Sequence, residues 1–126
     1  MTTNRLTGPD QIHDRFLRAT NEKDVEGLMA LYDTAGIAVQ LDGSEAVGEP
    51  AMRAMLDGLT TAIRRIDGTT RKLFVSGDIA LSSADWTAEI VLPDGSTITQ
   101  GGTTAEVSRR QPDGTWRVVI DDPLFA

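Results

Sequence analysis

The spacing of apolar residues changes along the chain from a helical period to a strand-like one. In the first half, apolar side chains recur every three or four residues, as in Met52, Leu56, Leu59 and Ile63. From Ile63 onward, short turn sequences separate runs that suit strands. This order predicts an α+β fold, a cone of three N-terminal helices packed on a strongly curved antiparallel sheet, with a cavity between the two layers.

Turn and cap residues place the expected elements. One helix starts near Pro9 and ends at Asn21; a second is capped by Asp24, includes Tyr32 and stops at Gly36. The third begins at Gly48-Glu49-Pro50. Turns are expected at 42–43, 67–68, 77–78, 93–95 and 112–114. They separate strands at 37–41, 71–76, 79–92, 96–110 and 116–121, with a bulge at 101–102.

Size and composition exclude several classes of protein. A chain of 126 residues fits one domain, 1–126, with one core. Twelve basic against nineteen acidic residues give a net charge of −7, which disfavours nucleic acid and anionic membranes as partners. There is no cysteine, and the single histidine, His13, excludes a multi-histidine metal site and leaves no metal or cofactor expected. With no long apolar run, a cytoplasmic protein is expected.

Three stretches carry a resemblance to a known superfamily. They are residues 19–32, with Asn21-Glu22-Lys23-Asp24, residues 48–53, and residues 106–123, which end in Trp116-Arg117 and Asp121-Asp122-Pro123. The chain resembles the nuclear transport factor 2-like superfamily, which includes ketosteroid isomerases and SnoaL-like cyclases. It is most similar to small bacterial ketosteroid isomerase homologues. The resemblance implies the cone-shaped fold and a homodimer.

The resemblance also implies an acid pair and a proton-transferring aspartate at defined positions. The tyrosine position falls at Phe16, the aspartate position near Gln40, and the second donor near Thr103 or Thr104. None of these side chains can do the expected chemistry. Steroid isomerisation by that mechanism is therefore disfavoured.

The last strand supplies the candidate catalytic acids, Asp122 and Asp121. Strict alternation places Asp122 on the face of Trp116 and Val118, at the mouth of the cavity, where apolar surroundings would raise its pKa. Asp121 then points to the other face. The alternative for both is a strand-end acid that accepts a backbone N–H or pairs with an arginine.

The expected ligand-binding residues are polar groups and an apolar wall. Gln40 and His13 could hydrogen-bond a ligand, although a solvent-exposed position is the alternative for each. The wall would consist of Phe16, Tyr32, Met55, Trp86 and Trp116, which could instead be core residues.

These features predict a pocket protein for a small, mostly apolar organic ligand. It could be a cofactor-free isomerase, cyclase or hydratase that acts on a carbonyl-type compound with a carboxylate base. The alternative is a non-catalytic ligand-binding or dimerisation module. The opposite sheet face, expected to carry Thr87, Glu89, Thr104 and Glu106, would meet a second copy in a homodimer.

Overall fold

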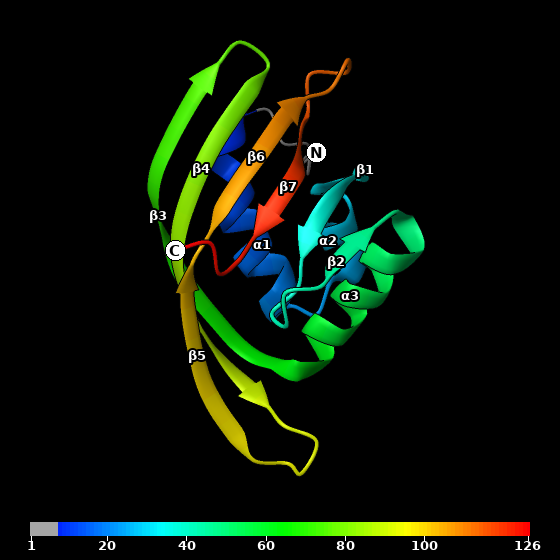
Figure 1. Cartoon of the computed structure of the whole chain (residues 1–126), viewed down its shortest axis with the longest axis vertical. Helices are drawn as coiled ribbons and strands as arrows, with labels where there is room; N and C mark the ends of the chain where they lie inside the picture. The colour runs from blue at the N-terminus through cyan, green and yellow to red at the C-terminus, as the bar shows by residue number, and fades with distance from the viewer. Residues whose placement is uncertain (1–7) are drawn as a thin grey trace.

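A computed structural model describes residues 8–126, so the first seven residues of the expected domain lie outside the described part. A seven-stranded sheet curls around three helices, all on its concave side (Figure 1). The elements are η1 (Pro9–Gln11), α1 (Ile12–Asn21), α2 (Val25–Met29), β1 (Tyr32–Val39), β2 (Glu45–Val47), α3 (Glu49–Ala62), β3 (Ile63–Ser76), β4 (Ile79–Val91), β5 (Thr97–Thr103), β6 (Ala105–Arg110) and β7 (Trp116–Asp122). The α+β class and the curved sheet are confirmed.

The strand order is β2-β1-β7-β6-β4-β3, and β5 pairs with β4. All pairs are antiparallel except β1 with β7, which is parallel. The sheet is therefore mixed, where a purely antiparallel one was expected. The β4–β5 hairpin extends beyond the body of the sheet (Figure 1).

The helices follow the expected caps but differ at their ends. Asp24 caps α2, since its carboxylate accepts the Gly27 N–H at 2.9 Å. Gly48 precedes α3 with φ of 88°, a conformation that favours glycine. The second helix ends at Met29 instead of including Tyr32, because Leu31 already accepts a hydrogen bond from Val118 of β7 and the chain has entered the sheet.

The strands are longer and less interrupted than the turn signals predicted. The expected turn at Asp67-Gly68 lies inside β3, where Gly68 pairs with Trp86. The expected bulge at Gly101-Gly102 is also absent, since β4 and β5 pair there without a register shift. A Cβ on Gly102 would lie 2.5 Å from the Leu124 side chain, so this glycine leaves room for the C-terminal segment.

The core fills the space between the helices and one end of the sheet. Its buried side chains come from α1, α2, α3, β1 and β7 and include Leu28, Met52, Leu56, Tyr32 and Trp116. A second cluster lies under α1 and consists of Ile63, Ile66, Trp86 and Ala88. No helix among residues 8–126 is long and apolar enough to cross a membrane.

Candidate active site

A cavity of about 350 Å³ lies between the helices and the concave face of the sheet. Its volume is in the range of sites for small organic molecules. Most of the wall is apolar and comes from α1, α3, the strands and the C-terminal segment: Phe16, Val39, Leu41, Met55, Leu56, Leu59, Ile63, Ile66, Trp86 and Pro123. The polar lining residues are His13, Tyr32, Gln40, Asp42, Thr104, Glu106 and Asp121.

Asp121 faces this cavity because β7 contains a bulge. Ser108 of β6 pairs with Val118, whereas the preceding Val107 pairs with Ile120, so Val119 is one extra residue on β7. The extra residue reverses the alternation after Val118 and leaves Ile120 exposed on the outer face. Asp121, and not Asp122, therefore shares the inner face with Val118.

Gly36 of β1 makes room for the bulge. A Cβ at this position would lie 2.2 Å from the carbonyl oxygen of Val119. The pairing of β1 with β7 shifts register between Tyr32 and Ile37, on either side of this glycine. The close approach of the two backbones therefore explains why the residue here has no side chain.

Asp122 lies outside the set of cavity-lining residues. Its carboxylate accepts the backbone N–H of Leu124 at 3.0 Å. The expected orientation of Asp122 at the cavity mouth is not observed, because alternation from Trp116 does not hold across the bulge. The side chain instead makes the strand-end hydrogen bond that the sequence left as the alternative.

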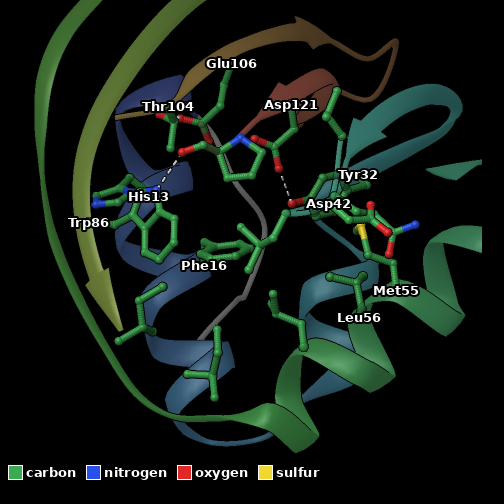
Figure 2. A pocket seen from close by; sticks show the side chains of 17 residues that line it. His13, Phe16, Tyr32, Asp42, Met55, Leu56, Trp86, Thr104, Glu106 and Asp121 are labelled. Atoms are coloured by element: carbon green, nitrogen blue, oxygen red, sulfur yellow. Dashed lines mark hydrogen bonds between the residues drawn. The ribbon is translucent and has the colours of Figure 1, made fainter. Parts of the chain in front are cut away.

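Tyr32 donates a hydrogen bond to Asp121 inside the cavity. Its hydroxyl oxygen lies 2.7 Å from Oδ2 of Asp121 (Figure 2). Burial, and then the charge of Asp121, raise the pKa of the Tyr32 phenol well above its usual value. The phenol is thus protonated at neutral pH and acts as a donor.

Glu106 is the second carboxylate of the cavity and the direct cross-strand partner of Asp121. Directly opposed residues in a sheet have Cβ atoms about 5 Å apart. The Thr104 hydroxyl donates to Glu106 Oε1 at 2.8 Å, and Figure 2 shows both carboxylates at the same end of the cavity. Glu106 and Thr104 were expected on the outer face, where Thr87 and Glu89 do lie exposed.

Burial is the main reason that both carboxyl groups are weaker acids than usual. It raises the pKa of Asp121 to about 6, with the Tyr32 hydrogen bond acting in the opposite direction and the Asp122 charge adding to the rise. Burial, and then the charge of Asp121, raise the pKa of Glu106 to about 7, against the hydrogen bond from Thr104. Near neutral pH the two groups titrate as a pair.

His13 contributes to the wall of the cavity next to Trp86 (Figure 2). Its side chain is buried, and its Nε2 has no hydrogen-bond partner. A Cβ on Gly68 would lie 2.9 Å from this nitrogen, so Nε2 packs against the β3 backbone. Burial lowers the pKa of His13, against the Asp14 charge and a backbone hydrogen bond with Gly68, so the imidazole is neutral at pH 7.

The other expected ligand-binding residues divide between cavity and core. Phe16, Gln40, Met55 and Trp86 line the cavity, whereas Trp116 is buried in the core and does not. The indole N–H of Trp86 donates to the carbonyl of Pro123 at 2.7 Å and holds the C-terminal segment against the wall.

Glu106 and Asp42 line the cavity although neither was expected there from the sequence. One sequence signal pointed to Glu106. It lies two residues after Thr104, and therefore on the same face of a strand, and the resemblance places a hydrogen-bond donor near Thr103 or Thr104. Asp42 lies in the β1–β2 turn. Among residues 8–126, no group of three or more acidic or histidine side chains is arranged to hold a metal ion.

Comparison with known proteins places this geometry in a family. The SnoaL-like domain matches residues 13–120. The chain belongs to this family. Its membership of the wider nuclear transport factor 2-like superfamily, expected from the sequence, is confirmed. A search of curated proteins found no match.

Solved structures share the fold of this SnoaL-like protein at low sequence identity. A conserved protein from Planctomyces limnophilus is 16% identical, with a TM-score of 0.79 and 90% of each chain covered. A nuclear transport factor 2-like superfamily protein from Salmonella enterica is also 16% identical, with a TM-score of 0.76 over 93% of this chain and 89% of that one. A ketosteroid isomerase-like protein from Erwinia carotovora is 15% identical, with a TM-score of 0.78 over 87% of each chain.

Proposed function

We propose that this SnoaL-like protein is a cofactor-free enzyme that moves a proton on a small, mostly apolar carbonyl compound. The observation that carries the proposal is the pair of opposed carboxyl groups, Asp121 and Glu106, inside an apolar cavity. Carboxyl groups with a pKa near the working pH are effective in both giving and taking protons. The likeness to a ketosteroid isomerase-like protein agrees with this class of reaction.

The two carboxyl groups have different roles in the proposed reaction. Asp121, the stronger acid of the two, is ionised and takes a proton from the carbon next to the carbonyl. The C–H electron pair forms a C=C bond, and the carbonyl π electrons move onto oxygen. Glu106, the weaker acid, gives its proton to that oxygen, so an enol results without a free charge. In a β,γ-unsaturated ketone, Asp121 then gives its proton to the γ carbon, the C=C electron pairs shift, and the enol proton returns to Glu106 as the carbonyl forms again, which completes an isomerisation.

The positions that correspond to the acids and the base of ketosteroid isomerases carry other residue types in this chain, so the proposed reaction uses different groups. Phe16, Gln40 and Thr104 all line the cavity, but none of these side chains is an acid or a base at neutral pH. The ionisable groups instead lie at Glu106 and Asp121. The proposed chemistry is thus an acid–base reaction with its own pair of residues.

Deuterium exchange tests this function without knowledge of the natural substrate. The protein is incubated in D₂O with a panel of neutral six- to ten-carbon cyclic ketones and enones, and NMR follows exchange at the carbon next to the carbonyl. We expect catalysed exchange with at least one compound, and a loss of about 10²- to 10⁴-fold in Asp121→Asn. Asp122→Asn, the neighbouring acid outside the cavity, should retain the rate.

The opposite result for the two aspartates would refute the assignment. If Asp122→Asn removes exchange and Asp121→Asn does not, the bulge does not decide which acid is used. If no compound exchanges and none raises the melting temperature, the non-catalytic module is the better account.

We also propose that the protein is a homodimer that joins through the outer face of the sheet. An apolar row crosses six strands in register: Phe74, Leu81, Val107, Ile120, Ile37 and Val47. Phe74, Val47 and Leu81 are 61%, 57% and 48% exposed. A continuous apolar surface of this kind is typical of a protein interface, and a symmetric dimer would cover it.

Sedimentation velocity tests the dimer. Leu81→Lys places a charge in the middle of the apolar row and should convert dimer to monomer at micromolar concentration. Ala54→Lys adds the same charge at an exposed position of α3, away from the sheet, and should leave the dimer intact. A wild-type protein that sediments as a monomer at all concentrations would refute the proposal.

A further inference from the structure

The charges that line the cavity all have the same sign. The acidic lining residues are Asp42 in the β1–β2 turn, Glu106 on β6 and Asp121 on β7, and no lysine or arginine lines the cavity among residues 8–126. The lining residues of α3 and β3 are apolar, and His13 on α1 is neutral because burial lowers its pKa. None of the lining residues that the structure describes therefore offers a positive charge to a ligand at neutral pH.

The ion pairs of the described residues lie on the exposed surface and not in the cavity. Arg53 pairs with Glu26, Arg71 with Asp85 and Arg110 with Asp78, all on exposed surface. Arg117 on β7 donates to the backbone carbonyl of Tyr32. The Tyr32 hydroxyl donates to Asp121 and the Thr104 hydroxyl donates to Glu106, and both donors are neutral. Within residues 8–126, none of the ion pairs involves either of the two buried carboxyl groups.

This arrangement limits the ligands that the cavity can hold. A carboxylate, a phosphate or a phosphorylated carrier would enter beside two acids and lose its hydration without gaining a counter-charge. A protonated amine would be stabilised in the cavity, because its positive charge pairs with the ionised carboxylates. The aromatic rings of Phe16 and Trp86, which also line the cavity, suit both an apolar skeleton and a cation.

We infer that the substrate is an apolar carbonyl compound that carries a basic amine, and that the cavity selects against anionic analogues. The inference rests on the proposed function, because it concerns the ligand of the same cavity. Asp42 lies in the turn at one side of the cavity and stays ionised, because hydrogen bonds from Ser44 lower its pKa. The ammonium group would bind between Asp42 and the carboxylate pair, with the carbonyl directed to Glu106.

A charge series on one skeleton tests the inference. The probes are three cyclohexanones whose 4-substituent is dimethylaminomethyl, methoxymethyl or carboxymethyl, so that the ligand charge is +1, 0 or −1. Calorimetric titration of the full chain at pH 8 gives the affinities. We expect the amine to bind at least about tenfold more tightly than the ether, and the acid more weakly than the ether, as Coulomb attraction in a partly buried site implies.

Two variants assign this preference to the cavity. Asp42→Asn should reduce the difference in affinity between the amine and the ether. Glu106→Gln, as a separate variant, should reduce this difference by more than Asp42→Asn does. Asp57→Asn makes the same change of net charge on the exposed side of α3 and should leave the preference unchanged. Because Asp42 is exposed, its variant tests the inference even if a buried substitution disturbs folding.

The pH dependence gives a second readout. Asp42 is ionised and Tyr32 is uncharged from pH 5 to 8, whereas Asp121 and Glu106 ionise as the pH rises over this range. Burial lowers the pKa of His13, and any proton that it loses over this range changes the charge of the cavity in the same direction. The amine's advantage over the ether should therefore grow over this range.

The outcomes separate the inference from the proposed function. Equal affinity for the amine and the ether, with catalysed exchange of either ketone, would overturn the inference and leave the enzymatic function in place. Tightest binding of the carboxylate would overturn the inference as well. If none of the three binds and no ketone undergoes exchange, the proposed function fails, and the inference fails with it.

Discussion

At the scale of single residues, the carboxyl group of Asp121 is defined by what surrounds it. The Tyr32 hydroxyl donates to it, Glu106 lies opposite, and the backbone bulge at Val119 turns it inward. Its neighbour Asp122 differs by one position in the chain and makes only a local hydrogen bond at the strand end. The environment, and not the residue type, therefore makes one of two adjacent aspartates a candidate base.

Tyr32→Phe should raise the pKa of Asp121 above about 6. The hydrogen bond from the phenol stabilises the ionised carboxylate, and its loss leaves the effect of burial unopposed. The ring still packs in the core, so the fold should remain. NMR titration of ¹³C-labelled carboxyl groups measures the change. An unchanged or lower pKa would show that the hydrogen bond does not act on the ionised form.

At the scale of elements, the sequence predicted several boundaries of helices and strands but not the bulge in β7, which decides the face that Asp121 occupies. The caps at Asp24 and Gly48 and the strand boundaries near Ile79 and Trp116 were predicted correctly, because they follow from local chemistry. Which face Asp121 occupies depends on a register shift between strands. Alternation along a single strand carries no information about such a shift.

The same limit applies to Glu106 and to the second helix. The cavity contains Glu106 only because β6 pairs with β7 in a register that the sequence does not show. Tyr32 follows Val25, Leu28 and Met29 at helical spacing, yet it lies in β1. Its side chain packs in the same core as those of α2, so the pattern of apolar residues does not distinguish the helix from the strand here. Turn signals also failed at Gly68, where the glycine serves close packing against His13.

Gly36→Ala should destabilise the fold by about 2–4 kcal/mol, because its Cβ would overlap the carbonyl of Val119 and force the bulge to move. Gly58→Ala is the matched control: it lies exposed on α3 with open space around it and should be neutral or stabilise by about 0.5–1 kcal/mol. Urea denaturation measures both. Equal stability of the two variants would show that Gly36 is not required by the bulge.

At the scale of the whole molecule, the paired acids link stability to pH. Both have a higher pKa in the folded protein than in the unfolded chain, so the folded state holds protons more tightly. Their contribution to stability is complete below pH 4 and is lost as the pH rises through about 6 and about 7. An ordinary salt-bridged carboxylate behaves in the opposite way, because its contribution to stability is lost as the pH falls.

Removing both charges should remove this pH dependence. The double variant Asp121→Asn with Glu106→Gln should be more stable than the wild type at pH 8, by on the order of 2–5 kcal/mol given the sizes of the two shifts. At pH 4 the two proteins should be similar. Thermal unfolding across this range measures the difference, and a parallel pH profile for the two proteins would contradict the account.

The account depends most directly on Asp121 and Glu106 acting as a coupled pair inside the cavity. Carboxyl ¹³C NMR of the wild-type protein between pH 3 and 9 measures this without any ligand. The account predicts that the two groups titrate at about 6 and about 7, and that each resonance also reports the ionisation of the other. Independent titration of both groups near pH 4 would contradict it.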